Sequence, residues 1–441
     1  MSKASQVLTL SGLGLLRKCG CGLLILLFLG GCGGREEGVL RVSFWAGHEE
    51  YRIEQRNINE FMRLHPGITV RLESIPFTDS FKEKTLTAFA AGTPADVILL
   101  DSKDSPTFVR EGLLLDLAPY VQKLGVDLNI YYPNVLSIAM RDSALYALPK
   151  DFTPMMMFYN KRLFDEAGLP YPKLGWTWED YLDLARQLTR DTNNDGIPDQ
   201  YGTTFSHYFR YWQPWVWANG GDVLSPDGSR ATGYFNSPRT EEALQFLIEL
   251  RTKHGVAPHQ EALALAGRTQ NLFYAGRVAM TESGHWFIPN LRDFMQQGII
   301  DIGVAPLPVP NGDPEGGEQI NVMYESGWAV AKHTKHRDEA VRLAAFLAGE
   351  YANRNRAQAG LAISAIRRIA EEMVALDTTG LEKAFVDQIP KCRQPWGTTV
   401  EKFDLVEEYT QEAIEKVMIQ GEEIHKAFTD AARRIDEELA R

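Results

Sequence analysis

The chain has 441 residues, a formal net charge of −12 at pH 7, and hydrophobic residues at 44% of its positions. This length exceeds what one hydrophobic core usually organises, which argues against a single domain and predicts two. The acidic balance argues against nucleic acid as a partner, because binding to phosphates needs a basic surface.

The N-terminal residues have the pattern of an export signal. Two basic residues, Arg17 and Lys18, precede an apolar stretch that ends just before Cys32. The stretch has roughly ten residues, half of the ~20 that a membrane-spanning helix needs, so we predict a signal peptide over residues 1–31. The run Leu-Gly-Gly-Cys ending at Cys32 resembles a bacterial lipobox. This implies a lipidated Cys32, a tether over residues 32–38, and an extracytoplasmic protein anchored to the cell membrane. The alternative is an ordinary signal peptide with a chance cysteine.

Beyond the tether, segments typical of strands and helices alternate. We expect strands over residues 39–45, 68–75 and 95–101, and helices over residues 50–64 and 80–91. This order is typical of a parallel α/β sheet. Capping and breaking residues predict later helices over residues 178–190, 238–254, 338–347 and 400–439, the last with a break near Gly421. Dense proline and glycine predict a surface loop over residues 306–317.

Five segments narrow the fold further. They are Gly-Thr-Pro-Ala-Asp-Val at 92–97, Leu-Pro at 148–149 with Phe-Tyr-Asn-Lys-Arg-Leu-Phe at 158–164, Thr-Trp-Glu-Asp at 177–180, Gly-Arg-Val-Ala-Met at 276–280 with Gly-His-Trp at 284–286, and the segment 329–347. In this order they resemble the extracellular solute-binding proteins of ABC importers, a family that includes the maltose-binding and related sugar-binding proteins. Each segment alone is a weak signal, but together they span nearly all of the chain beyond the tether.

The resemblance implies an α/β protein with the two-lobed, type II periplasmic-binding-protein-like fold. Each lobe is expected to be a mainly parallel sheet flanked by helices, with a hinge between the lobes. By analogy, one lobe comprises residues 38–148 plus 281–325, and the other comprises residues 149–280 plus 326–441.

The same resemblance implies a function. We expect the substrate-binding subunit of an ABC importer, which captures a sugar, oligosaccharide or related polyol between its lobes and delivers it to the membrane permease. Such a protein is a monomer that needs no cofactor and is not an enzyme.

Two other classes of function stay open. A secreted carbohydrate-active enzyme, such as a glycosidase or lyase, also needs many carboxylates and aromatic residues, although the sequence has no nucleophile elbow, HExxH motif or complete triad signature. The other class is a protein that binds a non-sugar solute, such as glycerol phosphate, a polyamine or a peptide, or that binds another protein.

Sugar recognition requires flat apolar faces for the C–H side of the ring and fixed polar groups for its hydroxyls. Trp45 ends the first expected strand, and His48 and Glu49 follow it shortly after. Asp101 and Ser102 stand at the end of the third expected strand. Because open α/β sheets bind ligands at the carboxyl ends of their strands, we predict these residues in the binding site. For Asp101, a cap on the following helix is the alternative.

Other candidates come from the resemblance and from their places in the chain. The family has a stacking tryptophan where Trp286 stands, another near Trp396, and an aromatic residue in the stretch that contains Trp212 and Trp217. For Trp212 and Trp217, packing in the core is the alternative. Two acids complete the set, Asp151 near the expected hinge and Glu325, for which a structural salt bridge is the alternative.

A separate cluster of oxygen donors lies between residues 191 and 199. Asp191, Asn193, Asp195, Ile197 and Asp199 alternate, with a glycine at the sixth position, as in the first half of an EF-hand calcium loop. The pattern predicts either a shortened loop that binds a structural Ca²⁺, with Ile197 contributing its carbonyl, or a polar turn after the preceding helix.

Overall fold

A computed structural model describes residues 38–75, 80–141, 143–259, 262–263, 269–311 and 320–441. The predicted signal peptide, Cys32 and the tether up to residue 37 lie outside these residues, as does the predicted loop from residue 312 onward. Among the described residues, no helix has both the length and the apolar character that crossing a membrane requires.

The larger sheet, called the first sheet below, has seven strands. Six follow the order β11-β6-β10-β3-β1-β2, and β12 pairs with β10. β1 is parallel to β2 and β3, whereas β10 is antiparallel to β3 and β6. The strands are β1 (Val39–Trp45), β2 (Thr69–Ile75), β3 (Val97–Asp101), β6 (Ala147–Pro154), β10 (Asn321–Val330), β11 (Ile363–Ser364) and β12 (Cys392–Arg393).

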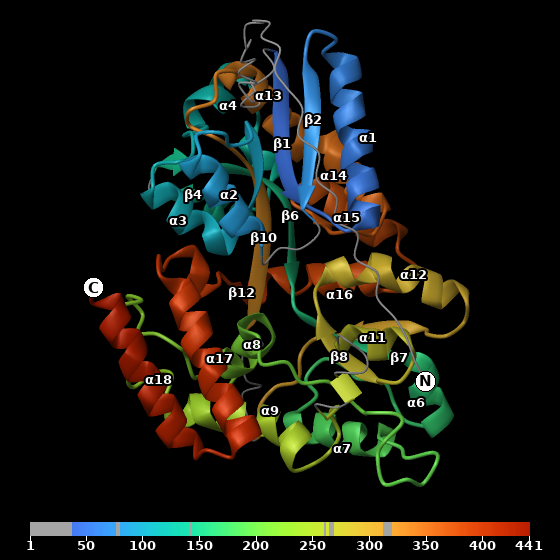
Figure 1. Cartoon of the computed structure of the whole chain (residues 1–441). Coiled ribbons are helices and arrows are strands. Elements are labelled where there is room, and N and C mark those ends of the chain that lie inside the picture. The colour runs from blue at the N-terminus through green and yellow to red at the C-terminus, as the bar shows by residue number, and fades with distance from the viewer. Residues whose placement is uncertain (1–37, 76–79, 142, 260–261, 264–268, 312–319) are drawn as a thin grey trace, which may run out of the picture. The chain divides into compact units, whose positions relative to one another are not determined.

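Helices pack on the first sheet because it has apolar side chains on both faces. In β3, Val97, Ile98, Leu99 and Leu100 are all buried, as expected for a strand covered on both sides. α13 packs on β10, β6 and β3, and α1 packs on β2 and α14 (Figure 1). The helices of this region are α1 (His48–Leu64), α2 (Phe81–Ala90), α3 (Ser105–Arg110), α4 (Ala118–Leu124), α5 (Pro133–Ile138), α13 (Arg337–Ala348), α14 (Glu350–Gln358) and α15 (Arg367–Leu376). A small hairpin joins β4 (Met140–Arg141) to β5 (Ala144–Leu145).

The second sheet has three strands in the order β8-β7-β9. β7 (Met156–Asn160) lies between β8 (Met280–Ser283) and β9 (Ile302–Ala305), and both pairings are antiparallel. The helices that follow β7 or complete this region are α6 (Lys161–Ala167), α7 (Trp178–Leu188), α8 (Phe209–Ala218), α9 (Pro238–Thr252), α11 (Thr269–Tyr274), α12 (Ile288–Gln296), α16 (Leu381–Val386), α17 (Phe403–Gln420) and α18 (Ile424–Leu439).

Two large apolar cores organise these elements. One contains Val42, Leu99 and Trp328 of the first sheet, and the other contains Trp178 and Phe428 from helices α7 and α18. α17 and α18 pack side by side in the second core, as Figure 1 shows. β6 continues almost directly into β7, so the chain passes from the first sheet to the second at residues 154–156.

The structure confirms the elements predicted from capping and periodicity. β1, β2 and β3 occupy the expected strand segments, and α1, α2, α7, α9 and α13 occupy the expected helix segments. Ser237 caps α9 by accepting a hydrogen bond from the Thr240 amide. Gly421 ends α17 with a left-handed backbone, φ +69°, a conformation that glycine adopts without a steric penalty.

Two details of the predicted fold are wrong. The sheets are not both mainly parallel, because β10 enters the first sheet in the opposite direction to β3, and the second sheet is wholly antiparallel. The division of the chain also differs. β9 and most of β8, expected with residues 38–148, pair instead with β7, and α13, expected with residues 149–280, packs on the first sheet. The reason is β10, which starts beside Met155 and then continues through the first sheet, so the helices directly after it, α13 to α15, belong there.

Candidate ligand-binding cavity

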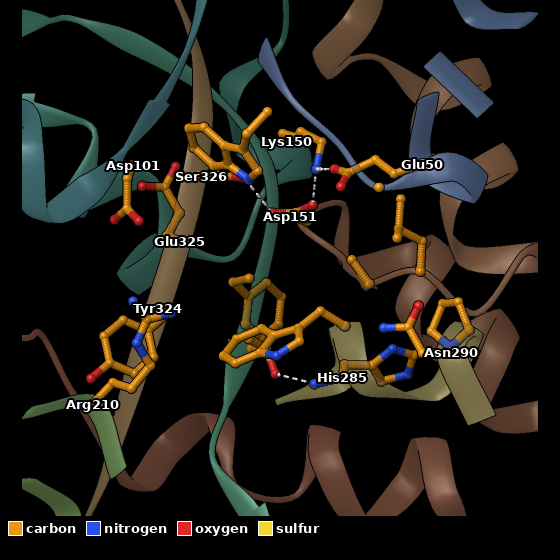
Figure 2. Close-up of a pocket in the computed structure, with 18 of the residues that line it drawn as sticks. Glu50, Asp101, Lys150, Asp151, Arg210, His285, Asn290, Tyr324, Glu325 and Ser326 are labelled. Carbon is orange, nitrogen blue, oxygen red and sulfur yellow. Dashed lines mark hydrogen bonds and ion pairs between the residues drawn. The ribbon is translucent and has the colours of Figure 1, made fainter. Parts of the chain in front are cut away.

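A cavity of about 370 Å³ lies where elements of both sheets meet (Figure 2). This volume falls within the range of about 300–1,000 Å³ that is typical of small-molecule sites. Its wall contains the loop after β1, the end of β3, parts of β6 and β10, and residues of α8, α12 and α17. Segments separated by more than 300 positions in the sequence therefore contribute to one site.

The structure brings together most of the residues predicted for the site. Seven of them line the cavity, and they are Trp45, His48, Glu49, Asp101, Asp151, Trp286 and Glu325. Ser102 is buried beside them and is not part of the lining. Direct contact of these side chains with a ligand stays a prediction.

Three predicted tryptophans do not line this cavity. Trp212 is fully buried in the second core, and its indole N–H donates to the His207 carbonyl at 2.9 Å. The indoles of Trp217 and Trp396 both donate to Asp222 Oδ1, at 2.9 and 2.6 Å. Their polar edges are therefore used within the protein, and the core-packing alternative holds for Trp212 and Trp217.

Helical geometry explains the position of Trp212. Arg210 of the same helix lines the cavity, and two residues correspond to about 200° around an α-helix. Trp212 therefore points away from the cavity when Arg210 points into it. Most residues of α8 are aromatic or apolar, so the sequence did not show which face of this helix would line the cavity.

Several lining residues were missed in the sequence. They are Glu50, Lys103, Lys150, Arg210, Tyr324 and Glu407. Glu50, Lys103, Lys150 and Tyr324 lie within two positions of a predicted residue that lines the cavity, so a prediction that included every residue at each strand end would have found them. Arg210 lies two positions before Trp212, which does not line the cavity, and Glu407 had no predicted neighbour.

A buried lysine organises one wall of the cavity. Lys150 Nζ lies 3.0 Å from Glu50 Oε1 and contacts Asp151 Oδ2, with only 3% of its side chain exposed. Burial alone would lower its pKa, but Asp151 and Glu50 outweigh burial and raise it. Burial raises the pKa of Glu50, an effect that Lys150 opposes. The other Asp151 oxygen accepts a hydrogen bond from Ser326 Oγ at 2.5 Å. This wall is therefore fixed by its own ion pairs, and the structural salt bridge weighed for Asp151 is present.

Glu325 differs from its neighbours. It is 5% exposed and makes no salt bridge, and its Oε1 has no hydrogen-bond partner among the described residues. Burial raises the pKa of this carboxyl well above its usual range, and the negative charges of Asp151 and Asp101 raise it further. Figure 2 shows Glu325 and Asp101 beside each other at one end of the cavity.

The lining also includes aromatic side chains and a second buried cation. Trp286 follows Gly284, where a Cβ would lie 2.3 Å from the indole ring, so the ring can occupy its place only because residue 284 is glycine. Trp45 packs edge-on against Phe81 with ring centroids 5.2 Å apart. Arg210 lies near Tyr324, and the nearby phenols and acids hold the pKa of its guanidinium above the usual value despite burial.

The segment with the calcium-loop pattern forms a turn in which carboxylates accept hydrogen bonds from backbone amides of the same segment. Asp191 accepts hydrogen bonds from the Asp195 and Gly196 amides, Asp195 from the Ile197 amide, and Asp199 from the Thr192 and Asn193 amides. Within the part of the chain that the structure describes, no group of three or more His, Cys, Asp or Glu side chains could hold a metal ion. Calcium binding stays a prediction, and the polar turn is the alternative that these bonds favour.

Comparisons with known proteins agree with this geometry. The family model described as bacterial extracellular solute-binding protein matches residues 45–353. The galactooligosaccharide-binding protein of Bacillus subtilis is 25% identical over 378 residues, which cover 81% of this chain and 82% of that protein. A binding protein of Brucella abortus is 25% identical over 283 residues, which cover 64% of this chain and 65% of its own length.

Two solved structures extend the likeness to the fold. A substrate-binding protein from Listeria monocytogenes in complex with cycloalternan superposes with a TM-score of 0.81 at 22% identity, covering 91% of this chain and 99% of that one. A maltodextrin-binding domain from Bdellovibrio bacteriovorus bound to maltotriose gives a TM-score of 0.76 at 20% identity, covering 91% and 100%.

Proposed function

The chain belongs to the family of bacterial extracellular solute-binding proteins, and on this premise we propose that it is the substrate-binding subunit of an ABC importer for a sugar, oligosaccharide or related polyol. Its type II periplasmic-binding-protein-like fold is confirmed by the likeness to solved structures. The relatives are binding proteins, among them proteins for galactooligosaccharides, arabinooligosaccharides and maltotriose.

The cavity supports this proposal most directly. It joins the indoles of Trp45 and Trp286 with the carboxyl groups of Asp101, Asp151 and Glu325. Indoles stack on the C–H faces of pyranose rings, and buried carboxylates accept hydrogen bonds from hydroxyls more strongly than neutral acceptors do. Micromolar affinity requires about −8 kcal/mol, which a few stacked rings and hydrogen bonds can supply.

Capture requires only that the sugar bind the closed arrangement of the lobes better than the open one. The closed form then delivers the sugar to the transmembrane permease, with no covalent step. Members of this family act outside the cytoplasm. We propose that Cys32 carries the lipid anchor and that the body is a monomer.

A ligand screen tests the proposal. Thermal unfolding of the purified protein is measured with galacto-, arabino- and malto-oligosaccharides, and with glycerol phosphate, polyamines and short peptides. A ligand at 100 times its Kd stabilises the folded state by about 2.7 kcal/mol, so a specific sugar raises the melting temperature. Trp286→Ala removes this shift, whereas Tyr208→Ala, an exposed aromatic outside the cavity lining, leaves it intact.

Two outcomes contradict the proposal. A response to the non-sugar ligands alone reassigns the solute. Release of shortened or unsaturated products from an oligosaccharide favours the carbohydrate-active enzyme in place of a binding protein.

A further inference from the structure

Glu325 is a buried acid, and buried carboxyl groups ordinarily have a hydrogen-bond or ion-pair partner. Its carboxyl group folds back over Gly327, where a Cβ would lie 3.1 Å from Glu325 Oε1. The residue is 5% exposed, lines the cavity, and has an unpartnered oxygen. A buried carboxyl group must be paired or take up a proton, so the unpartnered Glu325 oxygen can bind a group that comes from outside the protein.

Two more carboxyl groups, those of Asp101 and Asp151, line the same cavity. Ser326, the next residue in β10, is the cross-strand partner of both Asp101 and Asp151. The charges that act on Glu325 are those of these two acids, and both have the same sign as its own carboxylate. Glu325, Asp101 and Asp151 form what we call the acidic pole of the cavity.

Among the described residues, no Lys or Arg side chain of the cavity forms an ion pair with Glu325. Lys150 is bound to Glu50 and Asp151, and Lys103 Nζ lies 3.4 Å from Glu407 Oε2. Arg210 lies on the side of Tyr324 in Figure 2, away from Glu325. The buried His285 directs its Nε2 to Glu382 at 2.9 Å. Asp151 is therefore paired with Lys150, whereas Glu325 has no cation in contact within the part of the chain that the structure describes.

We propose that the acidic pole binds a protonated amino group of the ligand, so that the solute is an amino sugar or an oligosaccharide with a free amine. This inference rests on the proposed function and narrows its substrate class. An ammonium group donates three hydrogen bonds, and in this place it forms an ion pair with the Glu325 carboxylate and is attracted by the neighbouring Asp101 and Asp151. A neutral sugar supplies only hydroxyl donors and forms no ion pair with Glu325.

Proton release accompanies this recognition. Burial and two neighbouring acids raise the pKa of Glu325, so in the free protein this carboxyl keeps its proton to a higher pH than an ordinary glutamate does. An arriving ammonium favours the carboxylate, so the proton leaves Glu325 for the solvent as the amine binds. Affinity for the amine therefore rises with pH up to the pH at which the amine itself loses its proton.

Calorimetry with matched sugars tests the proposal on the full chain. The pairs are glucosamine and glucose, galactosamine and galactose, and β-1,4-linked glucosamine and glucose oligomers. In at least one pair, we expect the amine to bind about tenfold tighter or more, in accord with a charge-assisted hydrogen bond. Glu325→Gln abolishes this preference, measured as the ratio of the two affinities, because both sugars lose the same contact with the carboxylate but only the amine loses an ionic partner. Glu83→Gln, which changes an exposed acid of α2 outside the cavity, leaves both affinities as they are.

A second readout needs no variant. Titrations of the native protein in buffers of different ionisation enthalpy measure proton release, which we expect with the amine and not with its hydroxyl counterpart. Equal affinity within every pair, a preference that Glu325→Gln retains, or amine binding without proton release overturns the amine assignment and leaves the sugar transport function standing. If no sugar of either kind binds, the proposed function falls as well.

Discussion

Removal of the Lys150 ammonium is the perturbation whose cost the structure defines best. Lys150→Met keeps an unbranched side chain one atom shorter and leaves two acids, Glu50 and Asp151, without their shared cation. Side chains of these acids are each 15% exposed. Removing one partner of a buried ion pair costs about 3–5 kcal/mol, because the remaining charge is buried and unpaired.

The matched control is Lys103→Met. Its ion pair with Glu407 is longer, at 3.4 Å, and the two side chains are 26% and 27% exposed. Water replaces such a pair readily, so we expect a loss of about 1 kcal/mol or less. Denaturant midpoints followed by tryptophan fluorescence compare the two variants with the native protein.

The pH dependence supplies a second check. The pKa of Glu50 in the folded protein is already raised by burial, and Lys150 is the group that lowers it. Without Lys150 this pKa rises further, so the protonated acid is favoured. The stability of Lys150→Met is therefore lost as pH rises through the raised pKa and recovers as pH falls toward about 4.3, the ordinary value for Glu. A cost equal to that of Lys103→Met, or one unchanged between pH 7 and about pH 4.5, would refute this account of the wall.

Three further predictions concern separate features. Gly284→Ala displaces the Trp286 indole, so it weakens sugar binding by calorimetry about as much as Trp286→Ala while the helix content by circular dichroism stays the same. Thr177→Ala removes the reciprocal capping box with Asp180 at the start of α7 and lowers stability to denaturant by about 1 kcal/mol. Because amides of the loop already satisfy Asp191, Asp195 and Asp199, we expect calcium to leave the melting temperature unchanged relative to a chelator; a calcium-dependent rise that Asp195→Asn abolishes would establish the calcium loop.

Local rules predicted the elements and one edge of the site. β1 and β3 are parallel neighbours, so their carboxyl ends meet. Asp101 at the end of β3 and His48 shortly after β1 therefore lie in one cavity, as the sequence indicated. Trp286 was placed by the motif that contains it. These predictions succeeded because strand direction and motif position are both local properties of the sequence.

Predictions failed where distant segments decide the outcome. Glu407 reaches the cavity from α17, and no local pattern marks that turn of the helix as different from the next. Trp212 lies in α8, which has apolar residues on all sides. The direction in which its indole points is therefore set by the side of the helix that packs against the second core. The division of the chain failed for the same reason, since the two ends of β10 have neighbours from different regions: Asn321 binds Met155, and Val330 pairs with Val97.

The connecting strands suggest how binding and lobe closure are coupled. β6 contributes Lys150 and Asp151 to the cavity, and β10 contributes Tyr324, Glu325 and Ser326. Both strands lie at the passage between the two sheets, where Asn321 holds the backbone of Met155 through two hydrogen bonds. The polar groups offered to a ligand thus lie on the segments that must bend if the lobes move. A ligand that binds these groups best in one arrangement favours that arrangement by the difference in its binding free energy, without any further element to transmit the change.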